Sequence, residues 1–501
     1  MSIAEIVFLC VYFGVLAVLS TYGSHRYRMA YLYYRHKFQL PTPKGELTEW
    51  PRVTVQLPIF NEMYVVQRLI DSVCSIQYPR ERFEVQVLDD STDETCGIAR
   101  GVVEKWKAQG IDIVYIHRTN RQGFKAGALE NGLHLAKGEY VAVFDADFVP
   151  GPDFLERTVP FFVDPKVGMV QVRWGHLNRE FSLLTQAQSI LLDGHFIIEH
   201  TARNRSGCFF NFNGTAGVWR RQTIIDAGGW QHDTLTEDLD LSYRAQLKGW
   251  QFTFLPDIIS PAEVPVDMNA FKGQQHRWAK GSIQTARKLL PTILTSKTLP
   301  FHVKREAWFH LSNNIAYPLM VLLAVMMPMS MVVRFQHGMY QTLFLDLPVF
   351  LAATASVSFF YIATVRELGL GWWDRIKYLP FLMSLGIGLS INQSRAVIEA
   401  LLHQESEFAR TPKTGSEGAK VQKVKKAYKG RRTWVPYVEL GFAVYFALSI
   451  WYAFEHDIYA SMPYLFLFMF GYAYVGLTSM FDFNKRRQVA AEAPPEAQPT
   501  A

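Results

Sequence analysis

The chain has 501 residues and a formal net charge of +6, with 49% hydrophobic, 14% aromatic and only 19% charged residues. These proportions exclude a uniformly soluble enzyme, because the apolar residues are concentrated in some segments, which indicates a soluble part and a membrane part. The positive charge lies in clusters beside apolar spans and no aromatic-plus-basic repeat is present, so nucleic acid is not an expected partner.

The first predicted element is an uncleaved transmembrane helix within residues 1–24. Residues Ile6 to Tyr22 are largely apolar and carry no charge, and basic side chains follow from His25 to Lys37. A secretory signal peptide carries its positive charge before the apolar run. The opposite order here predicts a helix whose C-terminal end lies in the cytoplasm.

An α/β domain is predicted after a proline-punctuated linker that ends at Pro51. Strand-like and helix-like segments alternate, which predicts a mostly parallel sheet covered by helices. In such sheets, ligands bind beyond the carboxyl ends of the strands. The predicted strands are residues 53–57, 84–88, 111–116 and 140–144, and helical patterns cover residues 65–75 and 98–109.

Polar motifs directly follow three of these strands. Asn61-Glu62 follow the first strand, Asp89-Asp90 the second and Asp145-Ala146-Asp147 the fourth. An Asp-x-Asp pair on a turn can hold a divalent cation, Mg²⁺ or Mn²⁺, that is shared with a pyrophosphate, although a turn cap explains the same pattern without a ligand. One carboxylate of Asp89-Asp90 can bind a ribose or a base edge, and a strand-ending Asx turn is the alternative.

Two later motifs add a cation and a candidate base. Lys125 opens a helix after a glycine, where a lysine can touch a phosphate and where an ordinary surface helix can also begin. Thr236-Glu237-Asp238 lies in a polar turn, where a carboxylate can take a proton from an attacking hydroxyl. Acidic residues are favourable at any helix N-terminus, so this motif alone leaves both interpretations open.

The sequence from Gln274 to Trp278 puts an amide, a cation and an aromatic ring on one side of a predicted helix. Gln274, Arg277 and Trp278 are three and four residues apart, a spacing that brings side chains to one helix face. The cation fits the charge of a leaving pyrophosphate, and the amide and the ring fit a sugar acceptor. An ordinary amphipathic helix with a surface arginine is the alternative.

The chain becomes strongly apolar from residue 311. The segment 378–402 is long enough to cross a bilayer, but its second half is polar and both of its flanks are basic. We therefore expect 378–402 to be interfacial or re-entrant, with the segment 403–433 on the cytoplasmic side. Four other segments, 311–333, 347–365, 435–454 and 463–481, are each predicted to span the membrane.

These elements predict a multi-pass integral membrane protein of the plasma or inner membrane. The expected units are a transmembrane helix at 1–24, a cytoplasmic α/β domain at 25–300 that ends in interfacial helices, a membrane domain at 301–483 in contact with lipids, and a disordered tail at 484–501.

The order of the acidic motifs, the Gln-x-x-Arg-Trp sequence and the membrane spans resembles the processive, membrane-bound, inverting members of glycosyltransferase family 2, such as cellulose, chitin and hyaluronan synthases. The stretches Val55 to Glu62 and Val87 to Asp93 are most similar to the plant cellulose-synthase-like mannan and xyloglucan-backbone synthases. The resemblance runs from about residue 50 to about residue 480. It implies a Rossmann-like, nucleotide-sugar-binding domain of the GT-A type, inserted between the N-terminal transmembrane helix and a C-terminal helical membrane domain.

The resemblance also implies roles for the matching residues. Asp238 would be the catalytic base, and Arg277 would bind the pyrophosphate. Asp89 would contact the nucleoside, and Asp145 and Asp147 would hold the nucleotide diphosphate and its metal ion. The full donor side would comprise Asn61, Glu62, Asp89, Asp90, Lys125, Asp145 and Asp147, and the acceptor side Glu237, Gln274, Arg277 and Trp278.

A second part of the resemblance lies after the polar segment. Residues 408–413 resemble the family's gating loop, Phe-x-Val-Thr-x-Lys, with Phe408, Thr411 and Lys413 at the matching positions. Arg410 stands where the family pattern has valine. The gating role is therefore expected on three matching positions rather than on the whole motif.

The implied reaction is a single displacement, in which an acceptor hydroxyl attacks the anomeric carbon of UDP-glucose or GDP-mannose and a β-linked product forms. The expected product is a growing β-1,4-linked glucan or mannan that also crosses the membrane. Two other interpretations stay open at this point. One is a lipid glycosyltransferase that adds a hexose to ceramide or diacylglycerol, and the other is a transporter or membrane scaffold with a soluble domain.

Overall fold

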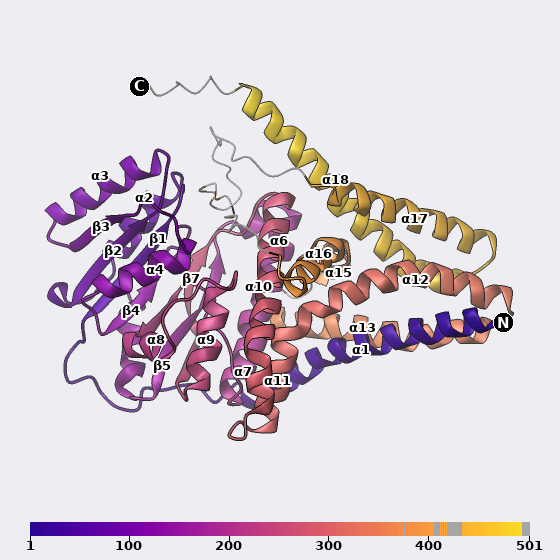
Figure 1. Cartoon of the computed structure of the whole chain (residues 1–501), viewed down its shortest axis with the longest axis horizontal. Coiled ribbons are helices and arrows are strands. Elements are labelled where there is room, and N and C mark those ends of the chain that lie inside the picture. The colour runs from indigo at the N-terminus through magenta and orange to yellow at the C-terminus, as the bar shows by residue number, and fades with distance from the viewer. Residues whose placement is uncertain are drawn as a thin grey trace.

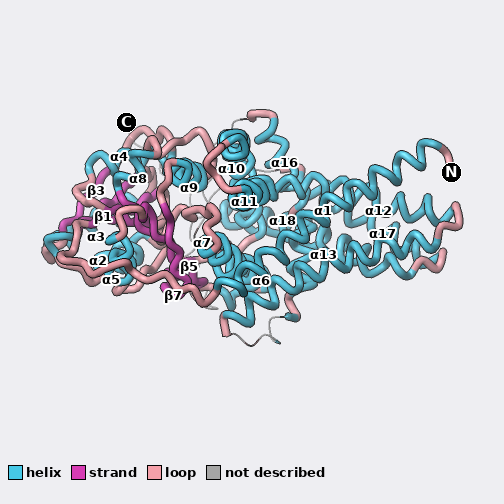
Figure 2. The backbone as a smooth tube through the Cα atoms, turned by 90° about the horizontal axis from the view of Figure 1, so that it is seen from below, coloured by secondary structure: helices cyan, strands magenta, loops and turns pink. Residues whose placement is uncertain are grey.

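The molecule consists of an α/β domain and a bundle of long helices that extends from one side of it (Figure 1). The computed structural model describes residues 1–369, 371, 373, 376–404, 411, 413, 415, 417 and 433–492. The N-terminus lies at the far end of the helical bundle, away from the sheet. In the view of Figure 2, the strands are confined to one end of the molecule and the long helices form the other.

A seven-stranded sheet forms the centre of the α/β domain, in the order β3-β2-β1-β4-β6-β5-β7. The first four strands are parallel, β6 is antiparallel to β4 and β5, and β5 and β7 are parallel. The predicted α/β fold with a mostly parallel sheet is confirmed, and three further strands complete it. The strands are β1 Val53–Ile59, β2 Phe83–Asp89, β3 Asp112–His117, β4 Tyr140–Val143, β5 Val167–His176, β6 Gly217–Arg220 and β7 Gln251–Ala262.

The strand order reverses between β1 and β4, which pair directly. From β1 the chain builds outward through β2 and β3, and with β4 it returns to the other side of β1. Such a reversal leaves a crevice at the carboxyl ends of the two strands, where α/β proteins bind ligands. The motifs after β1 and β4 therefore open into the same crevice.

Helices cover both faces of the sheet and create two hydrophobic cores. Successive side chains of β4 alternate between them: Tyr140 and Ala142 belong to one core, Val141 and Val143 to the other. Every residue of β2 and β4 is buried, as expected for strands covered on both faces. The helices of this part are α2 Val66–Cys74, α3 Thr95–Ala108, α4 Phe124–Leu135, α5 Phe154–Thr158, α6 Leu183–Asp193, α7 Thr201–Arg205, α8 Arg221–Asp226, α9 Glu237–Leu247 and α10 Met268–Thr295.

One segment between α6 and α7 departs from α-helical geometry. Residues Gly194–His200 form a π-helix, so the chain runs from α6 into α7 through a wider turn. π-helical turns are rare and occur mostly at functional positions.

The N-terminal helix α1, Ile3–His36, is longer than the predicted segment 1–24. Its second half is helical because it packs against protein: Met29, Ala30 and Tyr33 are buried in a cluster with side chains of the π-helix and of α13, Tyr340–Glu367. α1 also packs along α12, Ala316–Gln336.

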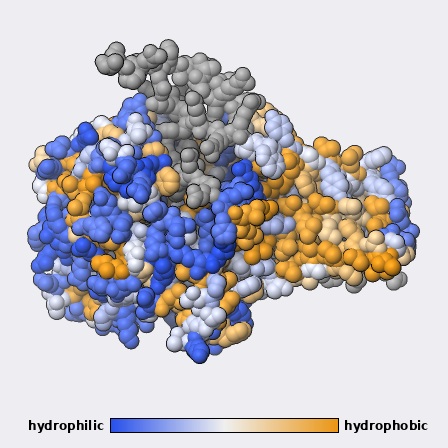
Figure 3. Space-filling model, viewed as in Figure 1, coloured by the Kyte–Doolittle hydropathy of each residue, from blue (hydrophilic) through white to orange (hydrophobic). Residues whose placement is uncertain are grey.

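Four described helical segments are long and apolar enough to cross a membrane: Ile3–His36, Phe301–Gln336, Val435–Glu455 and Tyr459–Asp482. Their side chains form a hydrophobic surface over the helical bundle, whereas the α/β domain is mainly hydrophilic (Figure 3). The fifth predicted span, 347–365, lies within α13. The remaining helices of the bundle are α11 Phe301–Ser312, α17 Val435–Glu455 and α18 Met462–Glu492.

The segment 378–402 is broken into two short helices, α15 Leu379–Gly388 and α16 Ser390–Leu401. Helices of 10 and 12 residues reach about 15 and 18 Å, well short of the roughly 30 Å of a bilayer core. α15 packs closely on α18, because a Cβ at Gly388 would lie 2.3 Å from the carbonyl oxygen of Gly471. α16 packs instead on α10.

Candidate active site

A cavity at the carboxyl ends of β1 and β4 collects side chains from distant parts of the sequence. Its wall includes most of the polar residues singled out in the sequence, and the chain contributes them from loops after strands, from the helices α4, α9 and α10, and from two residues that follow α16. The predicted residues in this wall are Glu62, Asp90, Lys125, Asp145, Asp147, Glu237, Asp238, Gln274, Arg277, Trp278, Thr411 and Lys413.

Asp238 stands in the first turn of α9 and forms part of the cavity wall. Its Oδ1 accepts a hydrogen bond from the backbone N–H of Leu239 at 2.8 Å, which holds the side chain at the helix start. The start of α9 lies tightly on α10, since a Cβ at Gly281 would lie 2.5 Å from the side chain of Thr236. Glycine at position 281 therefore lets α9 and the helix that carries Arg277 share one cavity.

The carboxyl groups of Glu237 and Asp238 both have raised pKa values. Burial and the neighbouring charge of Glu237 raise the pKa of Asp238 to about 7, against a smaller lowering effect of Lys125. Burial also raises the pKa of Glu237, although Lys125 acts in the opposite direction. A carboxylate with a pKa near neutrality can accept a proton during a reaction and release it afterwards.

Lys125 supplies the main positive charge opposite these carboxylates. It is presented by the first turn of α4, which begins after Gly123 in a left-handed conformation with φ of 71°. Its Nζ lies 2.5 Å from Asp145 Oδ1 and 3.9 Å from Glu237 Oε1, and it donates to the carbonyl of Gly214 at 2.9 Å. Burial opposes the charge, but Asp145 and Glu237 outweigh it and raise the pKa of Lys125.

Asp145 and Asp147 both line the cavity and fit a divalent cation by their chemistry. Carboxylate oxygens are the ligands that Mg²⁺ and Mn²⁺ prefer. Each carboxylate faces an ammonium group: Lys125 against Asp145, and Lys413 Nζ at 2.6 Å from Asp147 Oδ2. A divalent cation would compete with these ammonium groups for the carboxylate oxygens, and the two lysines would then be available to the phosphates of a donor.

The three residues of the Gln-x-x-Arg-Trp sequence all lie on α10 and line the cavity together. Asp267 caps the helix by accepting from the backbone N–H of Ala270 at 2.8 Å. Burial lowers the pKa of Arg277, while the charges of Glu237, Asp145 and Asp238 raise it. The Arg277 guanidinium is therefore a cation held close to three carboxylates, where the charge of a departing phosphate can be balanced.

The two carboxylates after β2 have different surroundings. Asp90 lines the cavity and forms a double ion pair with Arg118, whose Nε and Nη2 lie 2.8 and 2.5 Å from the two carboxylate oxygens. Asp89 is fully buried and is not among the cavity residues. Its predicted contact with the nucleoside stays a prediction.

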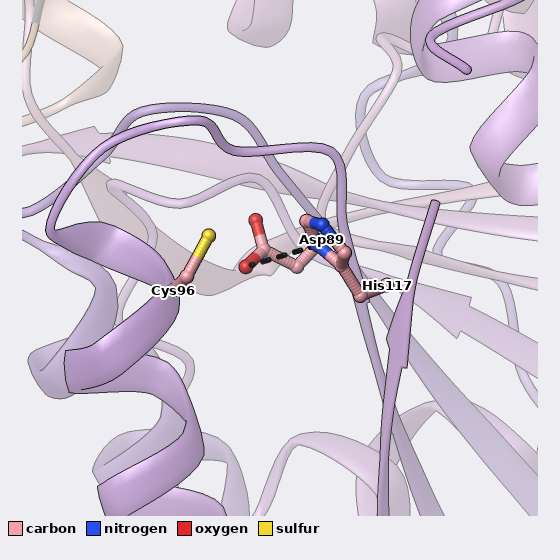
Figure 4. A group of neighbouring side chains, drawn as sticks. All are labelled: Asp89, Cys96 and His117. Atoms are coloured by element: carbon pink, nitrogen blue, oxygen red, sulfur yellow. Dashed lines mark ion pairs between the residues drawn. The ribbon is translucent and has the colours of Figure 1, made fainter. Parts of the chain in front are cut away.

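Asp89 belongs to a compact group with Cys96 and His117 at the ends of β2 and β3 and the start of α3 (Figure 4). The candidate ligand atoms of these three side chains lie within 4.8 Å of one another. The carboxylate is already bonded to protein: it accepts from the backbone of Ser91 at 2.8 Å and from the hydroxyl of Tyr115 at 2.6 Å. These bonds make Asp89 a fixed element behind the cavity wall.

Asn61 orders the loop after β1 rather than lining the cavity. It has a positive φ of 53°, and its side-chain oxygen accepts from the backbone of Thr92 at 2.8 Å. Ser91 Oγ in turn accepts from the Asn61 backbone N–H at 2.7 Å. The loops after β1 and β2 are thus joined, and Glu62 is presented to the cavity beside them.

Of the gating-like segment, Thr411 and Lys413 line the cavity, and Phe408 lies outside the described residues. Lys413 donates to the carbonyl of Glu263 at 3.0 Å as well as to Asp147. Thr411 and Lys413, which follow α16 in the chain, therefore reach the same cavity as the motifs of the α/β domain.

Several residues that line the cavity were not predicted from the sequence. Trp174 and His176 lie at the end of β5, and Asn213 precedes Gly214 in an irregular stretch before β6. The usable signal was Gly214, because a glycine among polar residues often marks a close backbone approach. A Cβ at Gly214 would indeed lie 3.1 Å from Asp238 Oδ2.

The comparisons with known proteins agree on the family. Residues 51–281 match the family model described as "Glycosyltransferase like family 2". The chain is 36% identical over 410 residues to "Probable glucomannan 4-beta-mannosyltransferase 7" of Oryza sativa subsp. japonica, covering 79% of this chain and 68% of that protein. It is 35% identical over 453 residues to "Probable glucomannan 4-beta-mannosyltransferase 9" of the same plant, covering 85% and 82%.

A solved structure supports the fold. The mannosyltransferase PcManGT from Pyrobaculum calidifontis, in complex with GDP-Man and Mn2+, matches with a TM-score of 0.51 and 21% identity. The match covers 78% of this chain and 100% of that chain. At this identity the match concerns the fold. The lipid-glycosyltransferase interpretation is wrong, because the similar plant proteins are named for a polymer, glucomannan, rather than for a glycolipid.

Proposed function

The chain belongs to the glycosyltransferase-like family 2, as a glycan-polymer glycosyltransferase of the cellulose-synthase-like mannan-synthase type, and we propose that it extends a β-1,4-linked mannan with mannose from GDP-mannose. The observation that carries the proposal is Asp238, a carboxyl group whose pKa is raised to about 7 by burial and by Glu237. It faces the cavity that also contains Lys125 and Arg277.

In the proposed reaction, the acceptor's 4-hydroxyl oxygen forms a bond to the anomeric carbon of the donor, and the bond from that carbon to the phosphate oxygen breaks. The nucleoside diphosphate leaves with the electron pair of that bond, and Asp238 receives the hydroxyl proton. One displacement inverts the configuration, so an α-linked donor gives a β-linked product. No covalent intermediate on the enzyme is required.

Positive side chains balance the charge that develops on the leaving group. Lys125 and Arg277 lie at the cavity beside the carboxylates, where a preorganised cation is worth more than in water. Asp145 and Asp147 would hold a divalent cation, Mg²⁺ or Mn²⁺, which when bound would neutralise the diphosphate. Gln274 and Trp278 would receive the acceptor end of the glycan, the ring by stacking and the amide by hydrogen bonding.

The choice of GDP-mannose over UDP-glucose follows from the relatives, whose names describe mannosyltransferases. The test uses the purified full-length protein in lipid nanodiscs with labelled GDP-mannose or labelled UDP-glucose. We expect label from GDP-mannose in an insoluble polymer that an endo-β-1,4-mannanase degrades. Label that enters only from UDP-glucose, or that is extracted with the lipids, contradicts the proposal.

We also propose a membrane arrangement for this enzyme. The α/β domain and the gating-like segment lie on the cytoplasmic side, with the helical bundle in the bilayer and α15 and α16 at the interface. Support comes from the shortness of α15 and α16 and from the basic flanks of that segment. On this arrangement, the segment that carries Lys413 can close over a cytosolic nucleotide sugar.

Thiol labelling of intact cells tests the arrangement. Ser416→Cys and His337→Cys are made one at a time in a cysteine-free chain, and an impermeant thiol reagent is added outside. His337 lies at the end of α12, and Ser416 lies outside the described residues. The thiol at position 337 should be labelled and the one at 416 protected. Labelling at 416 from outside contradicts the proposed side of the gating-like segment.

A further inference from the structure

Asn213 stands beside the proposed base and is itself held by two histidines. It lines the cavity, and the next residue, Gly214, approaches Asp238 so closely that a Cβ there would lie 3.1 Å from Asp238 Oδ2. Asn213 therefore lies in the part of the cavity wall next to Asp238. How that amide is oriented decides which sugar atoms it can bind.

The two histidines hold opposite ends of the amide. Asn213 Nδ2 lies 2.9 Å from His195 Nε2, and His200 Nε2 lies 2.7 Å from Asn213 Oδ1. Both histidines belong to the π-helix, and their ring centroids are 4.3 Å apart. Residues five apart would point about 140° away from each other on an α-helix. The wider π-helical turn is what brings both rings to one amide.

The hydrogen-bonding roles of the two His195 nitrogens follow from their partners, Glu199 and Asn213. Burial alone would raise the pKa of Glu199, but Arg203 and the hydrogen bond from His195 hold it well below its ordinary value. An ionised carboxylate only accepts hydrogen bonds, so His195 Nδ1, at 3.1 Å, must donate to it. Asn213 Nδ2 faces His195 Nε2 at 2.9 Å, so this nitrogen accepts a hydrogen bond from the amide NH₂ group and the ring proton lies on Nδ1.

The protonation of His200 agrees with this orientation. Burial lowers the pKa of His200 well below its ordinary value, so the ring is neutral. Its Nε2 lies near two oxygens, Asn213 Oδ1 and the carbonyl of Asn211 at 3.1 Å, and therefore carries the proton. Its Nδ1 has no hydrogen-bond partner among the described residues, as suits a bare nitrogen. The oxygen of the Asn213 amide must thus face His200.

The arrangement is anchored on the membrane helices. Arg203 donates from Nη1 to Glu199 at 3.2 Å and from Nε to Glu306 at 3.0 Å. Glu306, on α11, also pairs with His25 of α1 at 2.9 Å. A continuous series of polar contacts therefore runs from the N-terminal helix to the Asn213 amide.

We propose that His195 and His200 are positioning residues for acceptor binding, which fix the Asn213 amide so that its second N–H group binds an oxygen of the acceptor sugar beside Asp238. Among the described residues, no acceptor is recorded for that second N–H group, and the oxygen of the amide already receives His200 and, at 3.3 Å, the Asn211 side chain. The inference rests on the proposed function, because it requires a sugar acceptor at this place.

The test measures how transfer to the glycan competes with transfer to water. The nucleoside diphosphate released from GDP-mannose and the mannose incorporated into polymer are quantified in the same reaction of the full-length enzyme. Their ratio should be near one for the wild type. In His195→Phe, which keeps a ring and removes the hydrogen bonds, the ratio should rise about tenfold, while the Kd for GDP stays unchanged. His195→Gln, which returns an amide oxygen to the position of Nε2, should restore the ratio to within about twofold.

Tyr243→Phe is the matched control. It removes one buried hydrogen bond, the 2.8 Å contact between the Tyr243 hydroxyl and His310 Nδ1, and leaves the hydrogen bonds of Asn213 in place. Its ratio should stay near one even where its overall rate falls. Asn213→Ala removes the amide itself and should raise the ratio at least as much as His195→Phe, which keeps the test valid where His195→Phe does not fold.

Two results overturn the inference. The first is an unchanged ratio in folded Asn213→Ala and His195→Phe. The second is a higher Kd for GDP with a ratio that stays near one, which would mean that the amide binds the donor rather than the acceptor. Failure of the wild type to make polymer from GDP-mannose is a different result, since it refutes the proposed function itself.

Discussion

Two groups of buried or half-buried carboxylates occur in this molecule, and their surroundings shift pKa values in opposite directions. In the cavity, Glu237 and Asp238 are neighbours that share Lys125, and the pKa of both is raised. Below the cavity, Glu199 and Glu306 share Arg203, each also has a histidine partner, and the pKa of Glu199 is lowered. The direction of the pKa shift thus distinguishes carboxylates that can take up a proton in a reaction from carboxylates that stay ionised and pair with cations on neighbouring helices.

The largest effect is expected for the carboxylates that face phosphate. Asp145→Ala combined with Asp147→Ala should abolish transfer and raise the Kd for GDP at least about 100-fold with Mn²⁺ present, because the oxygen ligands for the cation are gone. Calorimetry measures the binding, and EDTA with the wild type should abolish turnover that Mg²⁺ or Mn²⁺ restores. Turnover that persists in EDTA removes the metal from the proposal.

The second-largest effect is expected on turnover when the proposed base, Asp238, is changed. Asp238→Asn keeps the size of the side chain and removes its ability to take a proton. Turnover should fall by roughly 10²-fold or more, with the Kd for GDP retained. The matched control is Asp240→Asn on the same helix, whose carboxylate pairs with Arg244 and Lys288 and is not a cavity residue. Near-wild-type turnover of Asp238→Asn contradicts the assignment.

Changes at the second group, Glu199 and Glu306, should affect the free energy of unfolding rather than turnover. Arg203→Leu leaves the buried Glu306 and the partly exposed Glu199 without their shared cation, and should lower the free energy of unfolding by about 3–5 kcal/mol, mainly through Glu306. Denaturation of the detergent-solubilised protein measures it. Arg305→Leu, an exposed arginine on the same helix as Glu306, should change the stability by no more than about 0.5 kcal/mol. Equal stabilities of the two variants would mean that the buried contacts contribute nothing.

The smallest effect is in the pH dependence. Because the pKa of Asp238 is raised to about 7 and the base acts ionised, kcat/KM should fall about tenfold per pH unit below that value. The stability has the opposite sign: a carboxyl group whose folded pKa is raised binds its proton more tightly when folded, so stability falls as pH rises from about 4 to 7. Asp238→Asn should therefore stabilise the protein more at pH 8 than at pH 5. A flat rate profile down to pH 5 contradicts the raised pKa.

Much of the α/β domain followed from local sequence. β1, β2 and β4 were predictable because each is a short run of mostly buried residues followed by polar ones that had to meet at one edge, and β3, with one buried residue, was predictable from its strand-like apolar pattern. The strands β5 to β7 were not predicted. β6 has only four residues, and its antiparallel pairing to β4 and β5 depends on a long return of the chain that no local pattern specifies.

The residues of the candidate site were predictable where their spacing along a regular helix determines which way their side chains point, and they were not predictable elsewhere. Gln274, Arg277 and Trp278 share a helix face by ordinary helical periodicity, and all three line the cavity. His195 and His200 have a spacing that an α-helix would send to different sides. Their meeting depends on the π-helical turn, which is set by packing rather than by the local sequence.

The extended N-terminal helix has a consequence for the time course of synthesis. α1 packs on α12 and α13, yet some 280 residues separate His36 from Ala316. At a ribosomal rate of about 5–20 residues per second, and on the proposed membrane arrangement, the first half of α1 waits on the order of 15–60 s before α12 emerges.

During that interval the α/β domain is translated, including the π-helix and α7, on which the second half of α1 packs. Tyr12, which is buried against α12 in the finished protein, is exposed to lipid or to other proteins until Arg334 arrives at its ring. The bundle therefore closes only late in translation. A ribosome-stalled chain that ends before α12 should hold a folded α/β domain and an α1 that remains accessible to photo-crosslinking by lipids, and release of the full chain should remove that accessibility.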